Sequence, residues 1–107
     1  MKRQKVFFDT ETTGLDRESD ELLQFSAINE TGKVLLNTYI KPTQHSEWKD
    51  AEAVNHISPD MVLHCRTIDE LLPEIQAIFD NCYEMIAYNF SFDFAFLKNA
   101  GVKFKPN

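Results

Sequence analysis

The first forty residues alternate between short apolar and polar stretches in a way that predicts three strands. Residues 4–10 contain an apolar run that is typical of a buried central strand. Residues 22–30 and 34–40 alternate closely enough to form a second and a third strand, with Thr31-Gly32-Lys33 as the hairpin turn between them. Pro42 is expected to end the third strand, because proline cannot donate a hydrogen bond to a strand ladder.

The middle of the chain carries signals of helices. Residues 46–55 are polar and predicted to be helical, with Trp48 as their apolar anchor. Ser58-Pro59 predicts a helix start, since serine caps a first turn and proline suits its first position. Thr67-Ile68-Asp69-Glu70 is a capping box that opens a further helix, in which Pro73 predicts a kink or a restart. The apolar stripe of that helix is expected to consist of Leu71, Leu72, Ile75, Ile78 and Phe79.

The last part of the chain fits two interpretations. Residues 84–88 are predicted to form a short strand. Within residues 89–97 a phenylalanine occupies every second position from Phe90 to Phe96, which is typical of a strand. The same residues also fit a helix that ends at Gly101, because glycine readily adopts the left-handed conformation found after a helix.

Length, composition and charge narrow the class of protein. The chain has 107 residues, a length typical of one domain, and is 43% hydrophobic, which is enough to build a core. The net charge of −6 argues against a protein that grips duplex nucleic acid through clustered Lys and Arg. The sequence shows no bilayer-spanning run and no signal peptide, and Cys65 and Cys82 lack metal-ligand spacing. We expect a cytoplasmic protein with free thiols and no contact with membranes.

The segment from Val6 to Leu15 carries the candidate chemistry. Its apolar run ends in two carboxylates one residue apart, followed by a Thr-Thr-Gly turn. Side chains two positions apart on a strand point to the same side, so Asp9 and Glu11 can converge on one hard cation. Mg²⁺ and Mn²⁺ bind oxygen ligands of this kind. A strand that ends in a polar turn is the alternative, and Asp-x-Glu alone does not exclude it.

Two segments together indicate a family. The string Phe-Asp-Thr-Glu-Thr-Thr-Gly-Leu at residues 8–15 resembles the first motif of the DEDD-type 3′–5′ exonucleases, which include the proofreading subunit of bacterial replicative DNA polymerase. Residues 87–97, Ala-Tyr-Asn-Phe-Ser-Phe-Asp-Phe-Ala-Phe-Leu, resemble the second motif, in which an Asn precedes Phe-Asp and Phe-Leu follows. Between them, residues 53–59 resemble a segment that lies near the substrate in that family.

The resemblance implies a fold. It favours the helix for residues 89–97 and places Asp93 in the first turn, where the helix dipole favours a carboxylate. The implied architecture is an α/β, ribonuclease-H-like mixed sheet. Three antiparallel strands come first, and a parallel strand follows a helical crossover.

The resemblance also implies a reaction and a set of site residues. Asp9, Glu11 and Asp93 are implied to bind two divalent cations, Mg²⁺ or Mn²⁺, and thereby to carry the catalysis. The implied substrate is the 3′ end of single-stranded DNA or RNA, whose terminal phosphodiester bond is hydrolysed. The implied substrate contacts are Thr10, Thr12, Leu15, His56 and Asn89. A surface acid at a helix start is the alternative for Asp93, as is a polar helix end for His56.

The third motif of the family is missing. His-x-x-x-x-Asp or Tyr-x-x-x-Asp supplies a general base and a fourth carboxylate there, but residues 94–107 contain neither His nor Asp. Matches that begin at His45 and His64 precede the second motif, and we treat both as coincidences. We therefore expect one exonuclease-like domain over residues 1–107, incomplete at its C-terminus, with little or no activity alone. Its last strand is expected to be an exposed edge that favours self-association, and a polymerase is a second candidate partner.

The sequence also leaves two other functions open. A degenerate member of the family would bind metal or nucleic acid without cleaving it. A phosphatase of the haloacid dehalogenase type also opens with an apolar strand and an Asp-x-Asp-x-Thr signature. Glu11 replaces the second Asp of that signature here, and no later segment resembles the remaining phosphatase motifs.

Overall fold

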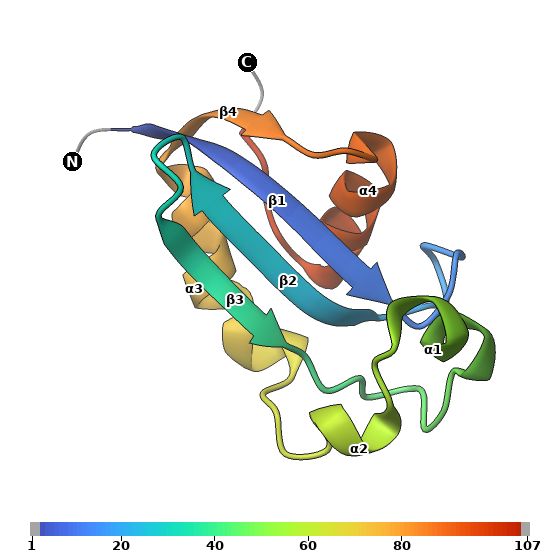
Figure 1. Ribbon diagram of the computed structural model, residues 1–107. Coiled ribbons are helices and arrows are strands. Elements are labelled where there is room, and N and C mark those ends of the chain that lie inside the picture. The colour runs from blue at the N-terminus through green and yellow to red at the C-terminus, as the bar shows by residue number, and fades with distance from the viewer. Residues whose placement is uncertain (1–2, 106–107) are drawn as a thin grey trace.

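The computed structural model describes residues 3–105 and contains one mixed sheet with helices. The elements along the chain are β1 (Gln4–Thr12), β2 (Leu22–Asn29), β3 (Val34–Tyr39), α1 (Lys49–Asn55), α2 (Pro59–Val62), α3 (Ile68–Asp80), β4 (Cys82–Ile86) and α4 (Phe90–Ala100). The strands lie in the order β3-β2-β1-β4, in which β1 pairs antiparallel with β2 and parallel with β4 (Figure 1). The predicted ribonuclease-H-like arrangement is confirmed.

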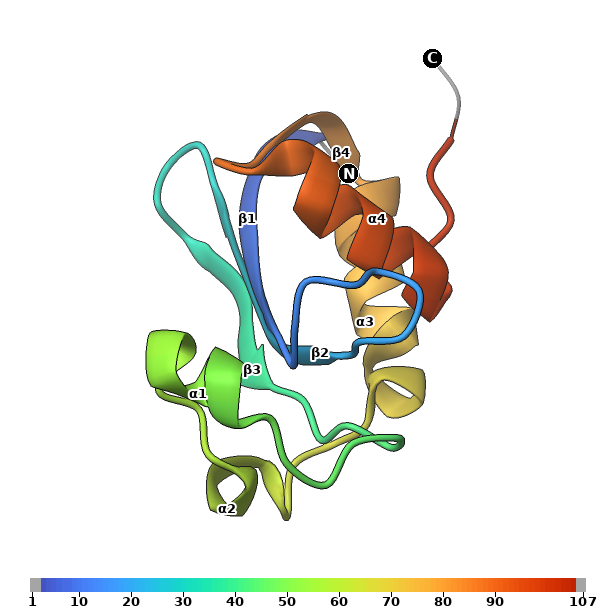
Figure 2. The ribbon, with the colours of Figure 1, turned by 90° about the vertical axis from the view of Figure 1, so that its right-hand side faces the viewer.

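The central strand β1 divides its side chains between a covered and an open face. Val6, Phe8 and Thr10 are buried, whereas Phe7 and Asp9 between them are exposed. Figure 2 shows α3 and α4 on one side of the sheet, with α1 and α2 beyond its end. The alternation in β1 therefore sends its apolar residues into the core and its carboxylates away from it.

Aromatic rings fill the space between the sheet and the helices. The ring of Phe79 on α3 packs edge-on against Phe8 on β1, with the centroids 5.2 Å apart. The same ring contacts Phe25 on β2 at 6.0 Å and Phe104 at 5.1 Å. Edge-to-face pairs of this kind stabilise a core beyond the area that they bury. Phe79 thus joins two strands, α3 and the segment after α4.

A second, smaller cluster holds α1 and α2 against the sheet. Leu23, Trp48, Ile57 and Val62 are all buried in it. The indole nitrogen of Trp48 donates a hydrogen bond to the backbone oxygen of Ile57, at 2.7 Å. Trp48 is the predicted anchor, although α1 begins after it at Lys49 rather than at residue 46.

The helices agree with the capping signals but not with the predicted effect of proline. Thr67 and Glu70 form the expected capping box. Helix α3 nevertheless runs through Pro73 as one element, so the predicted restart is wrong. The ring of Pro73 is exposed and faces solvent, and a proline removes only one bond of the helix ladder. None of the helices in residues 3–105 is long and apolar enough to cross a membrane.

The end of the chain resolves the ambiguous segment as a helix. Helix α4 covers Phe90–Ala100, and Gly101 ends it with a φ of 116°. Strand β4 spans Cys82–Ile86 rather than residues 84–88, because its register with β1 pairs Cys82 with Gln4 and Ile86 with Phe7. Within the described residues β4 forms one edge of the sheet, as expected. Both cysteines are free thiols, also as expected.

We expect Trp48→Phe to lower the free energy of unfolding by about 1–3 kcal/mol, because the buried carbonyl of Ile57 loses its donor while the aromatic packing stays. Urea unfolding followed by circular dichroism measures this change. Tyr88→Phe is the matched control, since its side chain is fully exposed. An unchanged midpoint for Trp48→Phe would show that the hydrogen bond does not hold this cluster together.

Candidate active site

The site lies where β1 extends beyond its neighbour β4. The pairing of these strands ends at Phe7 and Ile86, so the edge of β1 after Phe7 is free of β4. The first turns of α4 lie beside this free edge (Figure 1). The hydroxyl of Thr10 donates a hydrogen bond to Oδ1 of Asp93 on α4. Asp93 is only 2% exposed, and its Oδ2 has no hydrogen-bond partner within the described part of the chain.

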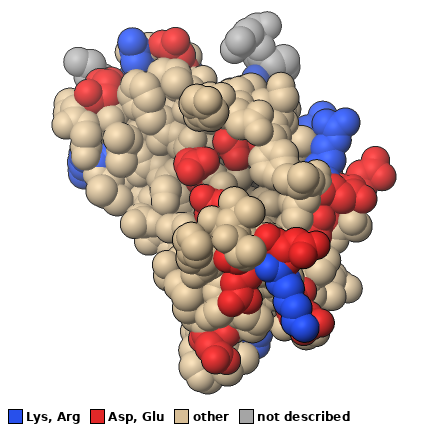
Figure 3. All heavy atoms as spheres, turned by 45° about the vertical axis from the view of Figure 1, so that its right-hand side comes forward, with Lys and Arg blue, Asp and Glu red and all other residues tan. Residues whose placement is uncertain are grey.

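The three predicted carboxylates influence one another electrostatically. Burial raises the pKa of Glu11, and the negative charges of Asp9 and Asp93 raise it further. Burial also raises the pKa of Asp93; the bond from Thr10 opposes this effect, and the charge of Asp9 adds to it. Asp9, Glu11 and Asp93 therefore lie near enough for their charges to influence one another. Figure 3 shows acidic side chains gathered in a hollow in the middle of one face, with Lys and Arg at its margins.

The carboxylates are the kind of ligand that a hard cation binds, but they do not form a complete coordination site. Within residues 3–105, no group of three His, Cys, Asp or Glu side chains is arranged closely enough to hold a metal ion as it stands. Carboxylates that face one another without a cation repel, which keeps them apart. The oxygen donors, the uncompensated negative charge and the unpartnered Oδ2 of Asp93 nevertheless fit Mg²⁺ or Mn²⁺.

A groove of about 710 Å³ borders one of these carboxylates, Glu11. Its walls come from the turn after β1, from α1 and from the start of α4. Glu11 and four of the predicted substrate contacts line this groove, namely Thr10, Thr12, Leu15 and Asn89. Asp9 instead lines a neighbouring hollow on the open face of the sheet. The two strand carboxylates thus lie between two hollows of the surface.

His56 is not among the residues that line the groove. It caps the end of α1 with a φ of 61°, is exposed, and donates its backbone amide to the oxygen of Glu52 at 2.8 Å. Its neighbour Asn55 lines the groove instead, and its side-chain amide donates to the oxygen of Thr12 at 3.1 Å. The structure therefore favours a polar helix end for His56.

Sequence reasoning missed two groove residues on α1. Val54 is 81% exposed and Asn55 is half-buried, and both line the groove. The available signal was the spacing from Ala51, since positions i, i+3 and i+4 share one face of a helix. An exposed valine on that face indicates a contact surface rather than a core position.

The turn after β1 is shaped by close contacts. The hydroxyl of Thr12 donates to the backbone oxygen of Gly14, at 2.6 Å. A Cβ on Gly14 would lie 2.3 Å from Oδ2 of Asp20, so only glycine fits there without displacing that carboxylate. Leu15 follows at the tip and is 88% exposed. The turn thereby presents an apolar side chain beside the carboxylates.

The fold is that of the ribonuclease-H-like class, and comparison with known families agrees. A family model described as "Exonuclease" matches residues 6–107. The chain belongs to the DEDD-type 3′–5′ exonuclease family. The matches give no support to the phosphatase or to a degenerate binding module.

Individual relatives and solved structures show the same relationship. The chain is 33% identical to a PolC-type DNA polymerase III from Thermotoga maritima over 96 residues, which cover 87% of this chain and 7% of the polymerase. It is 30% identical to an uncharacterised exonuclease of Escherichia phage 186, covering 87% of this chain and 46% of the relative. E. coli exonuclease I in complex with a dA16 oligonucleotide superposes with a TM-score of 0.80 at 22% identity, over 92% of this chain and 23% of that one. The chain thus spans less than half the length of these proteins.

We expect Asp93→Asn to stabilise the protein at neutral pH without divalent ions. Because the pKa of Asp93 is raised, its contribution to wild-type stability is greatest below the ordinary value of 3.8 and is lost as pH rises through the folded-state pKa. Asparagine does not titrate. The free energy of unfolding of Asp93→Asn should therefore exceed that of the wild type by about 1 kcal/mol at neutral pH, and this difference should shrink as the pH falls. Urea unfolding at several pH values with a chelator measures this difference.

Asp60→Asn is the matched control, since Asp60 is an exposed acid in the first turn of α2. Its substitution should leave the unfolding midpoint close to that of the wild type at every pH. A lower midpoint for Asp93→Asn at neutral pH would contradict the electrostatic interpretation of the buried carboxylate.

Proposed function

We propose that this chain provides the metal-binding carboxylates of a 3′–5′ exonuclease that hydrolyses the terminal phosphodiester of single-stranded DNA or RNA. Asp9, Glu11 and Asp93 would hold Mg²⁺ or Mn²⁺. One observation carries the proposal: a buried Asp93, with one carboxylate oxygen unpartnered among the described residues, lies near the charges of Asp9 and Glu11, and Glu11 lines a groove. Such an arrangement costs stability and is expected where a cation acts.

The carboxylates and their neighbours prepare the site for the reaction. When bound, two divalent ions activate the attacking water and stabilise the leaving oxygen. Glu11 and Asp93 have to be deprotonated before they ligate, and their raised pKa values make this step sensitive to acid. The hydroxyl of Thr10 holds Oδ1 of Asp93 and leaves Oδ2 available as a ligand.

The groove suits a terminal nucleotide of any sequence. Leu15 on the turn and Val54 on α1 are both exposed and line the groove together. A base inserted between apolar side chains gains stacking and dispersion energy with little sequence preference. Asn55 and Asn89 add amide groups that can bond to sugar or phosphate oxygens. This combination supports the removal of nucleotides one at a time from a free end.

The relatives suggest the setting of the reaction. The polymerases among them are described as DNA polymerase III of the PolC type, and solved exonuclease I structures include a dT13 oligonucleotide complex and an SSB-Ct complex. For this chain we propose a single-stranded 3′ end as the substrate. A polymerase or a second copy of the chain, paired along β4, are the candidate protein partners.

We expect calorimetry to detect Mn²⁺ binding that tightens as the pH rises through the pKa values of Glu11 and Asp93, since both carboxylates must release protons. Asp9→Asn and Glu11→Gln should each weaken binding at least about tenfold, because each removes a charged oxygen ligand. Glu47→Gln, an exposed acid outside the groove, is the control. Binding that is indifferent to both substitutions would place the metal elsewhere.

We expect a 5′-labelled single-stranded oligonucleotide to be shortened slowly from its 3′ end with Mn²⁺, if it is cleaved at all. Residues 94–107 offer no histidine, and a missing general base typically lowers the rate about 10²–10⁴-fold. Single-nucleotide laddering on a gel should disappear with Asp9→Ala and with a blocked 3′ end. Internal cleavage, or laddering that survives Asp9→Ala, would contradict the proposal. No cleavage with Mn²⁺ still bound would indicate an exonuclease site without its base.

A further inference from the structure

A carboxylate fills the inner side of the turn that forms one wall of the groove. Oδ1 of Asp20 accepts a hydrogen bond from the hydroxyl of Thr13 at 2.9 Å, and Oδ2 accepts one from the amide of Asp16 at 3.0 Å. Gly14 approaches the same carboxylate so closely that a Cβ would collide with it. The conformation of the turn therefore depends on where Asp20 is held.

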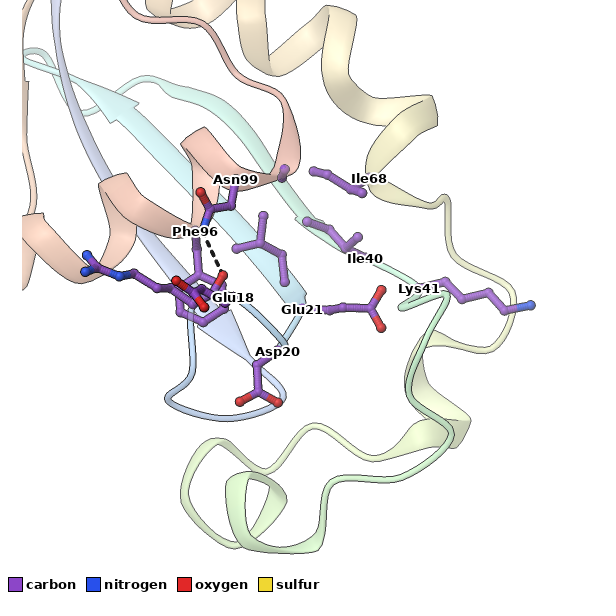
Figure 4. A pocket seen from close by; sticks show the side chains of 11 residues that line it. Glu18, Asp20, Glu21, Ile40, Lys41, Ile68, Phe96 and Asn99 are labelled. Atoms are coloured by element: carbon purple, nitrogen blue, oxygen red, sulfur yellow. Dashed lines mark hydrogen bonds between the residues drawn. The ribbon is translucent and has the colours of Figure 1, made fainter.

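The next residue, Glu21, ties this turn to the segment that leads into α1. Its amide donates to the hydroxyl of Thr13 at 3.0 Å, and its backbone oxygen accepts from the amide of Thr13 at 2.8 Å. Its carboxylate accepts from the amides of Thr43 at 2.7 Å and Gln44 at 2.6 Å. Figure 4 shows the side chains of Asp20 and Glu21 extending in different directions from the end of the loop.

His45 joins both carboxylates. Its Nδ1 lies 2.8 Å from Oε1 of Glu21, and its Nε2 lies 3.4 Å from Oδ1 of Asp20. A ring nitrogen that carries a proton can donate to a carboxylate, and bonds to charged acceptors are the stronger kind. Burial alone would raise the pKa of Glu21, but the bonds from His45, Thr43 and Gln44 lower it overall. The histidine thus adds a side-chain contact to both carboxylates, beside the bonds from Thr43 and Gln44 that already join the two segments.

We propose that His45 is a positioning residue that sets the width of the groove. Through Asp20 and Glu21 it fixes the wall that carries Leu15 relative to the wall that carries Val54. Its role rests on the proposed function, because the groove matters only if a terminal nucleotide occupies it. His45 touches no reacting atom and acts entirely through the two carboxylates.

Other contacts also hold the walls, since the amide of Asn55 donates to the backbone oxygen of Thr12, so losing His45 should shift the walls rather than unfold them. The indole of Trp48 joins the two ends of α1 through the backbone oxygen of Ile57, and both side chains pack with Leu23 of β2. The loop before β2 is fixed to α4, because the amide of Asn99 donates to the backbone oxygen of Arg17 at 2.8 Å (Figure 4). The contacts of His45 with Asp20 and Glu21 act beside the Asn55–Thr12 bond in placing the walls relative to each other.

The test compares His45→Ala with His45→Asn in the full chain. Asparagine places its amide nitrogen as many bonds from the backbone as Nδ1 of histidine, so it can keep the bond to Glu21. His64→Ala is the control, because His64 is exposed and forms no hydrogen bond or ion pair with residues of the described range. Amide NMR shifts of residues 13–16 report the turn. Calorimetry with thymidine 5′-monophosphate and Mn²⁺, and with Mn²⁺ alone, reports the groove and the metal site.

We expect His45→Ala to shift the turn amides and to weaken mononucleotide binding about tenfold, the effect of losing a bond to a charged group. His45→Asn should restore most of the affinity, and Mn²⁺ binding should be unchanged in both variants. Unchanged amide NMR shifts of residues 13–16 in His45→Ala would overturn the role of His45 but not the proposed function. Mononucleotide affinity that His45→Asn fails to restore would do the same. A wild-type chain that binds Mn²⁺ but no mononucleotide would overturn the proposed function, and this role with it.

Discussion

The hydrogen bond from Thr10 to Asp93 joins two segments that are 83 residues apart in the sequence. It forms only because β1 continues past the point where its pairing with β4 ends, which leaves a free edge beside α4. Without that contact, Asp93 would be an ordinary acid in a helix first turn, exposed and stabilised by the helix dipole. With it, the carboxylate is buried beside Asp9 and Glu11, and a common helix feature becomes part of an acidic site.

The same contact holds Asp93 in place but leaves its second carboxylate oxygen buried without a partner among the described residues. A buried carboxylate oxygen without a partner destabilises a folded protein, and the charges of Asp9 and Glu11 add to the effect. The surrounding core offsets this cost through the ring contacts of Phe8 and Phe79, which hold β1 against α3. A hard dication would remove the repulsion, so the electrostatic strain and the proposed chemistry have one origin.

The sequence predicted those parts of the molecule that depend on local pattern. The three antiparallel strands follow from alternation and one hairpin turn, and both the confirmed capping box and the carboxylate pair are local as well. The limits of β4 depend on its register with a distant strand, which no local pattern encodes. Whether His56 or Asn55 lines the groove could not be predicted for a similar reason. Which of the two faces the groove depends on where α1 ends and on the left-handed conformation of His56.

The positions of the carboxylates and the shape of the groove depend on different parts of the structure, although the same sequence motifs contribute residues to both. The carboxylates are positioned by a central strand and by a helix packed on the core, so their geometry is rigid. The walls of the groove are the turn after β1, α1 and the start of α4, and we propose that polar contacts of His45, Asp20 and Glu21 help to set their spacing. Under the proposed function, a change in His45, Asp20 or Glu21 would alter which nucleotide end fits without moving the proposed metal ligands. Specificity and chemistry would then depend on different contacts, so the same set of carboxylates could serve chains with different substrates.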